Sequence, residues 1–172
     1  TLAYLRRVFT WHEARSDDFR SPIVRGMSRT KPKERARERT LSDDEIRVIW
    51  KVADSQGVFG HLVKFILLTS ARRTEAAAMR RSELSGVDWT LPAVRNKTKV
   101  DLVRPLSKAA LAALPTKSGP FVFSTDGKNP ISGFSKFKRQ FDRAVESEAG
   151  EPIPTWTLHD LRRTARSMMS RA

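Results

Sequence analysis

The sequence predicts a mainly α-helical fold with a small antiparallel β-sheet, and three observations lead to this prediction. Apolar residues recur at intervals of three and four over most of the chain, which is the period of an amphipathic helix. Two helix-start signals stand out, at Ser42 and at Thr157, each with an acidic residue three positions later. Between them the apolar period changes at residues 89–95 and 102–106, which predicts a pair of short strands.

The composition points to a polyanionic partner. The 172-residue chain contains 33 Lys and Arg residues against 19 Asp and Glu residues, a formal net charge of +14. A chain this basic usually binds nucleic acid, although a ribosomal-type RNA binder or a protein at an anionic membrane surface also fits. Cysteine is absent, which excludes disulfides and thiolate metal sites and agrees with a reducing cytoplasm.

The first forty residues predict a helix followed by a linker. Residues 2–14 have a helical apolar period, whereas residues 16–40 are interrupted by proline and glycine and are dense in charge towards their end. We therefore expect residues 1–28 to be the helical end of a preceding domain, residues 29–40 a basic linker, and residues 41–172 the main domain. The linker is equally compatible with a strap along a phosphate backbone and with a solvated tether.

The main domain is expected to begin with two helices and an arginine pair. Residues 43–54 form an amphipathic helix, and residues 59–68 are apolar nearly all round, as in a buried central helix. Arg72 follows this helix closely, and a guanidinium near the core needs a partner, for which Glu75 is suitably spaced. Helical spacing continues over residues 76–80.

Basic side chains then follow on a hairpin and on a helix. The tip between the two strands contains Lys97 and Lys99, and residues 107–114 predict a short helix after it. Residues 134–145 predict an amphipathic helix whose polar side carries Lys136, Lys138 and Arg139. These side chains are oriented either towards DNA phosphates or simply towards water.

The last helix has one apolar and one basic side. Thr157 with Asp160 has the spacing of a capping box. The apolar side has helical spacing and contains Leu158, Leu161, Ala165 and Met168. The basic side contains His159, Arg162, Arg163 and Arg166. An imidazole beside a guanidinium suits phosphate binding and proton transfer, although a basic helix whose charges face water has the same pattern.

Three segments in this order resemble the sequence boxes of the tyrosine recombinases, the phage-integrase family of site-specific DNA recombinases. Residues 68–75 (LTSARRTE) resemble the first arginine box, and residues 89–97 with 105–107 resemble the β-hairpin box. Residues 159–164 (HDLRRT) resemble the second box. The resemblance covers roughly residues 41–171 and implies the fold of these DNA breaking–rejoining enzymes. It extends to residues 2–27, which are similar to the end of the family's core-binding domain.

The resemblance implies a catalytic site that needs no metal or cofactor. Arg72 and Arg162 would bind the scissile phosphate, and Glu75 would support Arg72. Lys97, in competition with Lys99 for the hairpin position, would protonate the departing 5′-oxygen, and His159 would assist proton transfer. The DNA-binding residues implied around this site are Lys99, Lys136, Lys138, Arg139, Arg163 and Arg166.

The sequence departs from the family pattern in two places. The family's nucleophilic tyrosine, which forms a 3′-phosphotyrosine, has no counterpart after Arg162, and Tyr4 is the chain's one tyrosine. We therefore expect a fragment that binds duplex DNA without cleaving it. The second departure is Ser70, where the family commonly has glycine.

The resemblance also implies partners, and two other functions stay open. The complete protein would act as a homotetramer on DNA in a prokaryotic cytoplasm. A non-catalytic nucleic-acid-binding module would have the same basic faces without a convergent site. A type IB topoisomerase-like enzyme would use a similar phosphate clamp without exchanging DNA partners.

Overall fold

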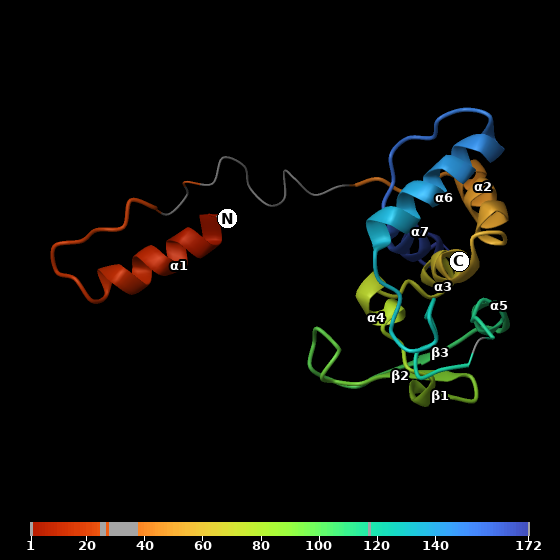
Figure 1. Ribbon diagram of the computed structural model, residues 1–172, viewed down its shortest axis with the longest axis horizontal. Coiled ribbons are helices and arrows are strands. Elements are labelled where there is room, and N and C mark those ends of the chain that lie inside the picture. Colours follow the sequence, from red (N-terminus) through yellow and green to blue (C-terminus); the bar gives the residue numbers. More distant parts are fainter. Residues whose placement is uncertain (1, 25–26, 28–37, 117, 172) are drawn as a thin grey trace. The chain divides into compact units, whose positions relative to one another are not determined.

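The computed structural model describes residues 2–24, 27, 38–116 and 118–171 of the chain (Figure 1). The chain divides into two compact units, Thr1–Glu38 and Arg39–Ala172. Most of the expected linker, residues 29–37, lies outside the described residues. Its role as a strap along DNA or as a solvated tether therefore stays a prediction.

The first unit contains helix α1, Leu2–Glu13, close to the helix expected over residues 2–14. Its end packs on the segment that follows, because the ring centroids of Phe9 and Phe19 are 5.9 Å apart. The helix buries none of its described residues, and large apolar side chains such as Tyr4 are exposed. The described part of this unit therefore has little apolar core of its own.

The second unit is built around helix α3, which is buried nearly all round, as its apolar sequence predicts. The helices among its described residues are α2 (Asp43–Ala53), α3 (Gly57–Thr69), α4 (Arg73–Ala77), α5 (Lys108–Ala112), α6 (Phe134–Ala149) and α7 (Leu158–Met169), with a 3-10 turn, η1 (Arg81–Glu83). Helix α3 packs against α2 and α7, and α2 packs against α6. The passage from α2 to α3 is tight, because a Cβ atom on Gly60 would lie 1.9 Å from the carbonyl oxygen of Ala53.

A three-stranded antiparallel sheet lies at one end of this unit (Figure 1). Its strands, in spatial order, are β1 (Leu84–Ser85), β2 (Asp88–Leu91) and β3 (Leu102–Pro105). Trp89 on β2 pairs with Arg104 on β3, so these side chains lie on the same face of the sheet. Trp89 is fully buried, and the register therefore places Arg104 beside the core.

The structure confirms the mainly helical fold with a small antiparallel sheet, and it confirms both capping boxes. Ser42 and Glu45 bond each other's backbone N–H groups at the start of α2, and Thr157 and Asp160 do so at the start of α7. Both boxes depend on residues three positions apart, which explains why they could be recognised in the sequence.

Some elements are shorter than expected. The first strand ends at Leu91, because the proline that follows begins a turn. The helix expected over residues 76–80 ends at Ala77, and Arg80 instead forms an isolated β-bridge with Phe121. Strand β1 was not predicted, since two residues are too few to show a period.

Two clusters of aromatic rings position the helices and the sheet. One joins α3, α6 and the segment just before α7, and its rings belong to Phe59, Phe137, Phe141 and Trp156. The other joins α3 to the sheet, and its rings belong to Phe65, Trp89 and Phe123. Helix α7 and the hairpin are thus both fixed against α3. None of the described helices is long and apolar enough to cross a membrane.

Candidate functional site

Arg72 lies in the sharp turn between α3 and α4. Helix α3 ends at Thr69, and its C-cap residue Ser70 has a φ of 54°, in the left-handed region that glycine adopts most readily. A glycine, as expected here from the resemblance to the tyrosine recombinases, would adopt this conformation without strain, and Ser70 adopts it with a side chain. Arg72 is the N-cap residue of α4, and its side chain is half-buried.

Glu75 is a buried carboxylate that binds two arginines. Its side chain is 4% exposed, and its Oε1 atom forms an ion pair with Nη1 of Arg72. Its Oε2 atom lies 3.3 Å from Nη2 of Arg104 and accepts the backbone N–H of Arg72 at 3.2 Å. The pairing of Arg72 with Glu75 expected from the sequence is confirmed, and Arg104 is an additional partner.

Helix α7 presents His159 and Arg162 from a rigid support. Leu158, Leu161 and Ala165 are buried against the core, so the opposite side of the helix faces outwards. Arg162 donates a hydrogen bond from Nη1 to the carbonyl oxygen of Ser70, across 92 positions in the sequence. This bond holds α7 directly against the turn that carries Arg72.

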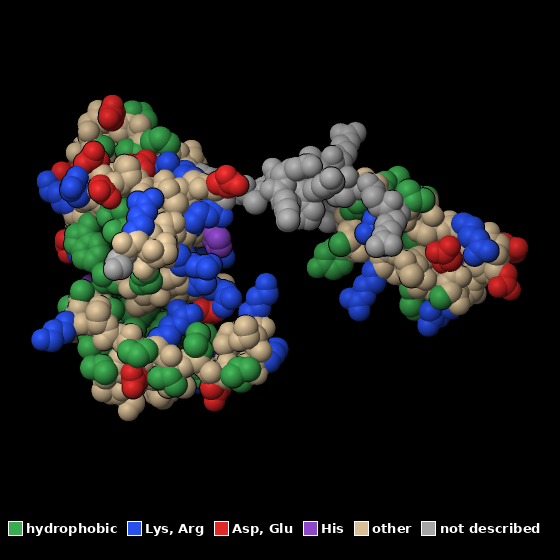
Figure 2. All heavy atoms as spheres, turned by 180° about the vertical axis from the view of Figure 1, so that it is seen from behind, with side chains coloured by type: hydrophobic (Ala, Val, Ile, Leu, Met, Phe, Trp, Pro, Cys, Tyr) green, Lys and Arg blue, Asp and Glu red, His purple; other side chains and the backbone are tan. Residues whose placement is uncertain are grey.

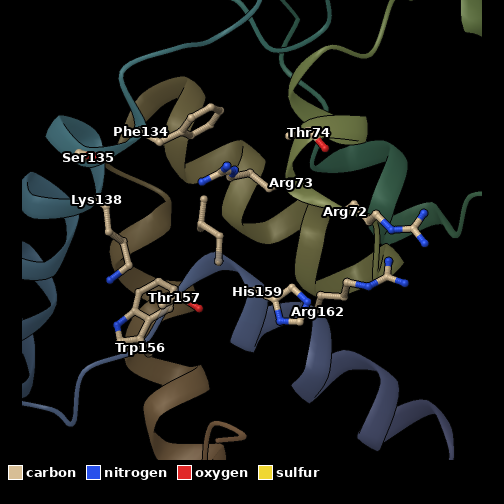
Figure 3. A pocket seen from close by; sticks show the side chains of 11 residues that line it. Arg72, Arg73, Thr74, Phe134, Ser135, Lys138, Trp156, Thr157, His159 and Arg162 are labelled. Atoms are coloured by element: carbon tan, nitrogen blue, oxygen red, sulfur yellow. The ribbon is translucent and has the colours of Figure 1, made fainter. Parts of the chain in front are cut away.

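Arg72, His159 and Arg162 therefore converge on one cavity of about 520 Å³. Figure 3 shows the guanidinium groups of Arg72 and Arg162 extending in the same direction, with the His159 ring beside Arg162. The full lining is Arg72, Arg73, Thr74, Phe134, Ser135, Lys138, Trp156, Thr157, Leu158, His159 and Arg162. This lining contains cations, hydroxyl groups and apolar side chains but no carboxylate, a combination suited to an anionic ligand.

Burial is the main cause that lowers the pKa of two arginines at the site, Arg162 and Arg104, and neighbouring charges add to or oppose it. Burial lowers the pKa of Arg162, the neighbouring Arg72 and Arg104 lower it further, and Glu75 opposes them. Burial also lowers the pKa of Arg104, where Glu75 raises it and Arg72 lowers it. An anion bound among these guanidinium groups would relieve the repulsion. Figure 2 shows Lys and Arg side chains gathered around a histidine on one face of the second unit.

The hairpin lysines are not among the residues that line this cavity. Lys97 and Lys99 are exposed at the tip between β2 and β3, which extends away from the sheet in Figure 1. The tip is closed by short bonds of its own, including one from the Ala93 N–H to Oδ1 of Asp101 at 2.5 Å. Lys99 has a φ of 58°. The roles of both lysines stay predictions.

Two of the expected DNA-binding residues line a second cavity along α7. Arg163 and Arg166 border this cavity of about 390 Å³, which His159 and Arg162 also line. Arg163 lies 3.4 Å from Oδ1 of Asp160. The two cavities share His159 and Arg162, so the basic side of α7 forms a continuous surface with the site.

The expected DNA-binding residues on α6 differ in their surroundings. Lys136 and Arg139 are exposed. Lys138 lines the first cavity, and its Nζ atom lies 3.8 Å from the ring centroid of Trp156 and pairs at 2.5 Å with Asp142, which is not part of the lining. The Lys138 ammonium group therefore has an acidic partner, whereas Arg139 donates from Nε to the carbonyl oxygen of Ser135 at 3.3 Å and, like Lys136, is exposed to solvent.

Sequence reasoning missed Arg104 and Arg95 as parts of the site. Arg95 forms an ion pair with Glu83 and donates from Nη2 to the carbonyl oxygen of Glu75 at 2.7 Å. A signal for Arg104 exists in the sequence, because strand alternation places it on the same face as Leu102, towards the core. Within the described residues, no group of three or more His, Asp or Glu side chains is arranged to hold a metal ion.

No family model and no curated protein matches the chain, but solved structures do. A lambda integrase tetramer bound to a Holliday junction matches with a TM-score of 0.72 and 20% identity, over 99% of this chain and 53% of that one. The catalytic domain of bacteriophage HP1 integrase matches with a TM-score of 0.54 and 25% identity, over 76% and 70%. XerA recombinase matches with a TM-score of 0.60 and 18% identity, over 97% and 59%.

These likenesses identify the fold. The chain has the fold of the tyrosine-recombinase catalytic domain, as the order of its sequence boxes predicts. It spans about half the length of the lambda integrase chain in the tetramer.

Proposed function

We propose that the chain is part of a site-specific DNA recombinase or integrase, and that its second unit binds duplex DNA and clamps the scissile phosphate. The observation that carries the proposal is the convergence of Arg72, His159 and Arg162 on one cavity without a carboxylate in its lining. The proposal is supported by the contact between the two segments that resemble the family's arginine boxes, in which Arg162 donates to the carbonyl oxygen of Ser70. A non-catalytic basic surface does not require this convergence.

In the proposed mechanism Arg72 and Arg162 bind the non-bridging oxygens of the phosphate. A planar guanidinium donates two parallel hydrogen bonds, and two such groups stabilise the charge of a pentacoordinate transition state without a metal ion. Glu75 keeps Arg72 in place through their ion pair. His159 is exposed beside Arg162, where its imidazole can orient the phosphate and transfer a proton.

The remaining steps involve the hairpin and a tyrosine. A tyrosine hydroxyl forms a bond to the phosphorus and gives up its proton to His159. The bond from phosphorus to the 5′-oxygen breaks, and Lys97 supplies the proton that this oxygen takes up. Tyr4, the chain's one tyrosine, belongs to the first unit, outside the sequence boxes. We therefore propose that this chain binds DNA without cleaving it. For the complete protein we propose a homotetramer on DNA in the cytoplasm, by analogy with the lambda integrase tetramer on a Holliday junction.

Salt-dependent DNA binding tests the proposed clamp. The dissociation constant for a mixed-sequence duplex should rise steeply with salt, with a logarithmic slope of about 0.9 for each phosphate contacted. Arg162→Ala should weaken binding about tenfold and reduce this slope by about 1. The matched control is Arg47→Ala, which removes an exposed charge on α2 that pairs with Asp44. Equal losses of DNA affinity in the two variants would contradict the proposed phosphate clamp.

A nicked suicide substrate tests the cleavage step. We expect no covalent protein–DNA adduct on a denaturing gel, because the second unit contains no tyrosine. A covalent adduct that forms with the wild-type protein but not with the Tyr4→Phe variant would show that Tyr4 is the nucleophile. This result would contradict the proposal that the chain binds without cleaving.

A further inference from the structure

Glu75 connects both arms of the β2–β3 hairpin to the candidate clamp. Before the tip, Arg95 donates from Nη2 to the Glu75 carbonyl oxygen at 2.7 Å. After the tip, Nη2 of Arg104 lies 3.3 Å from Oε2 of Glu75. The other carboxylate oxygen of Glu75 binds Arg72. One residue is thus the common anchor of the hairpin and of the first clamp arginine.

Arg104 is held in a defined position. Its side chain is 18% exposed, and its guanidinium carbon lies 5.3 Å from the ring centroid of Trp89. Trp89 is itself fully buried and donates from Nε1 to Oε2 of Glu83 at 3.1 Å. A cation that lies over a fixed ring and contacts a buried carboxylate has few alternative rotamers.

The tip beyond these arginines is bonded mainly to itself. Asn96 donates from Nδ2 to the Val100 carbonyl oxygen at 2.7 Å, and its own carbonyl oxygen accepts the Lys99 N–H at 3.1 Å. The four side chains from Lys97 to Val100 are exposed. The direction in which the tip extends therefore depends on what holds its base, and Arg95 and Arg104 are the side chains that reach from the base to Glu75.

We propose that Arg104 is a positioning residue, which acts through Glu75 to fix the direction in which the hairpin presents Lys97 relative to Arg72 and Arg162. This inference rests on the proposed function, in which Lys97 acts at the clamped phosphate. A purely structural role for Arg104, covering Trp89, would stabilise the fold without coupling it to Lys97.

A double-mutant cycle on DNA affinity separates these roles. In the otherwise unchanged chain, Lys97→Ala should weaken binding of a mixed-sequence duplex about fivefold, as for a charge-assisted contact. In the Arg104→Leu background the same change should have an effect of less than about twofold, because Lys97 is no longer directed at the phosphate. A loss of about fivefold in both backgrounds would overturn the positioning role and leave the clamp intact.

Arg80→Leu is the matched control for this cycle. Arg80 also lies over an aromatic ring, 5.4 Å from the centroid of Phe121, and the change removes the same charge. In this background Lys97→Ala should keep its full effect. If Arg80→Leu abolishes that effect as well, the coupling arises from net charge and the positioning role is wrong.

Two further variants keep the test decisive. Arg104→Lys retains a cation that can reach Glu75, so in this background Lys97→Ala should again weaken DNA binding by most of the fivefold factor. If Arg104 acted only by packing on Trp89, this recovery would not be expected. If Arg104→Leu does not fold, as judged by thermal unfolding, the cycle is run with Arg104→Gln, which should show the same loss of coupling. If Lys97→Ala has no effect in the otherwise unchanged chain, Arg104 does not direct Lys97 at the bound phosphate and the positioning role is overturned, whereas Arg162→Ala still reports on the clamp.

Discussion

The two parts of the candidate site are supported in opposite ways. Helix α7 carries His159 and Arg162 on one side and buries Leu161 on the other, and a capping box fixes its start. Lys97 lies on the hairpin tip. Consecutive side chains of the tip are exposed, and its hydrogen bonds are accessible to water. The helix is thus held by apolar burial, and the tip by polar contacts at its base.

This difference predicts different responses to mutation. Burial contributes several kcal/mol for a large apolar side chain, whereas a hydrogen bond accessible to water contributes about 1 kcal/mol or less. Changes beneath α7 should therefore alter the stability of the whole unit, and changes at the tip should alter mainly local motion and DNA contact.

The largest effect is expected for Leu161→Ala. Leu161 is fully buried, so the change should lower the free energy of unfolding by about 2–5 kcal/mol, the usual cost of such a cavity. Urea denaturation followed by circular dichroism measures this change. Met168→Ala, at a 48% exposed position on the same helix, should cost less than about 0.5 kcal/mol. Similar costs for the two variants would show that α7 is not packed on the core as described.

A smaller effect is expected at the start of α7. Thr157 accepts the Asp160 N–H with its side-chain oxygen, so Thr157→Ala should lower the free energy of unfolding by about 1 kcal/mol. Thr157→Ser keeps the hydroxyl oxygen and should retain most of this stability in the same urea experiment. Equal losses for Ala and Ser would mean that the capping bond contributes nothing.

The smallest effect on global stability is expected at the hairpin base. Asp101→Ala removes the acceptor of the Ala93 N–H, and the cost should be about 0.5 kcal/mol because the bond is exposed. Amide hydrogen exchange of residues 93–101 should nevertheless become faster, since this bond closes the tip. An unchanged exchange rate of these amides, or a loss of unfolding free energy as large as that of Leu161→Ala, would contradict the proposed difference between the tip and α7.

Several parts of the site could be predicted from the sequence because they depend on neighbouring residues. The Arg72–Glu75 ion pair and the Thr157–Asp160 capping box each join residues three positions apart. Arg104 could not be assigned in this way, because its partner Glu75 is 29 positions earlier and the contact requires the strand register. Strand β1 also went unpredicted, since two residues show no period.

The sequence by itself determined the helical fold class, the starts of α2 and α7, and the concentration of positive charge. These features follow from local hydrogen bonding, apolar period and composition, which do not depend on distant contacts. Only the tertiary structure decided that Arg72 and Arg162 share one cavity, that Glu75 also binds Arg104, and that Lys97 extends at an exposed tip. Those outcomes require α7 and the sheet to pack against α3, and such packing depends on contacts between residues far apart in the chain.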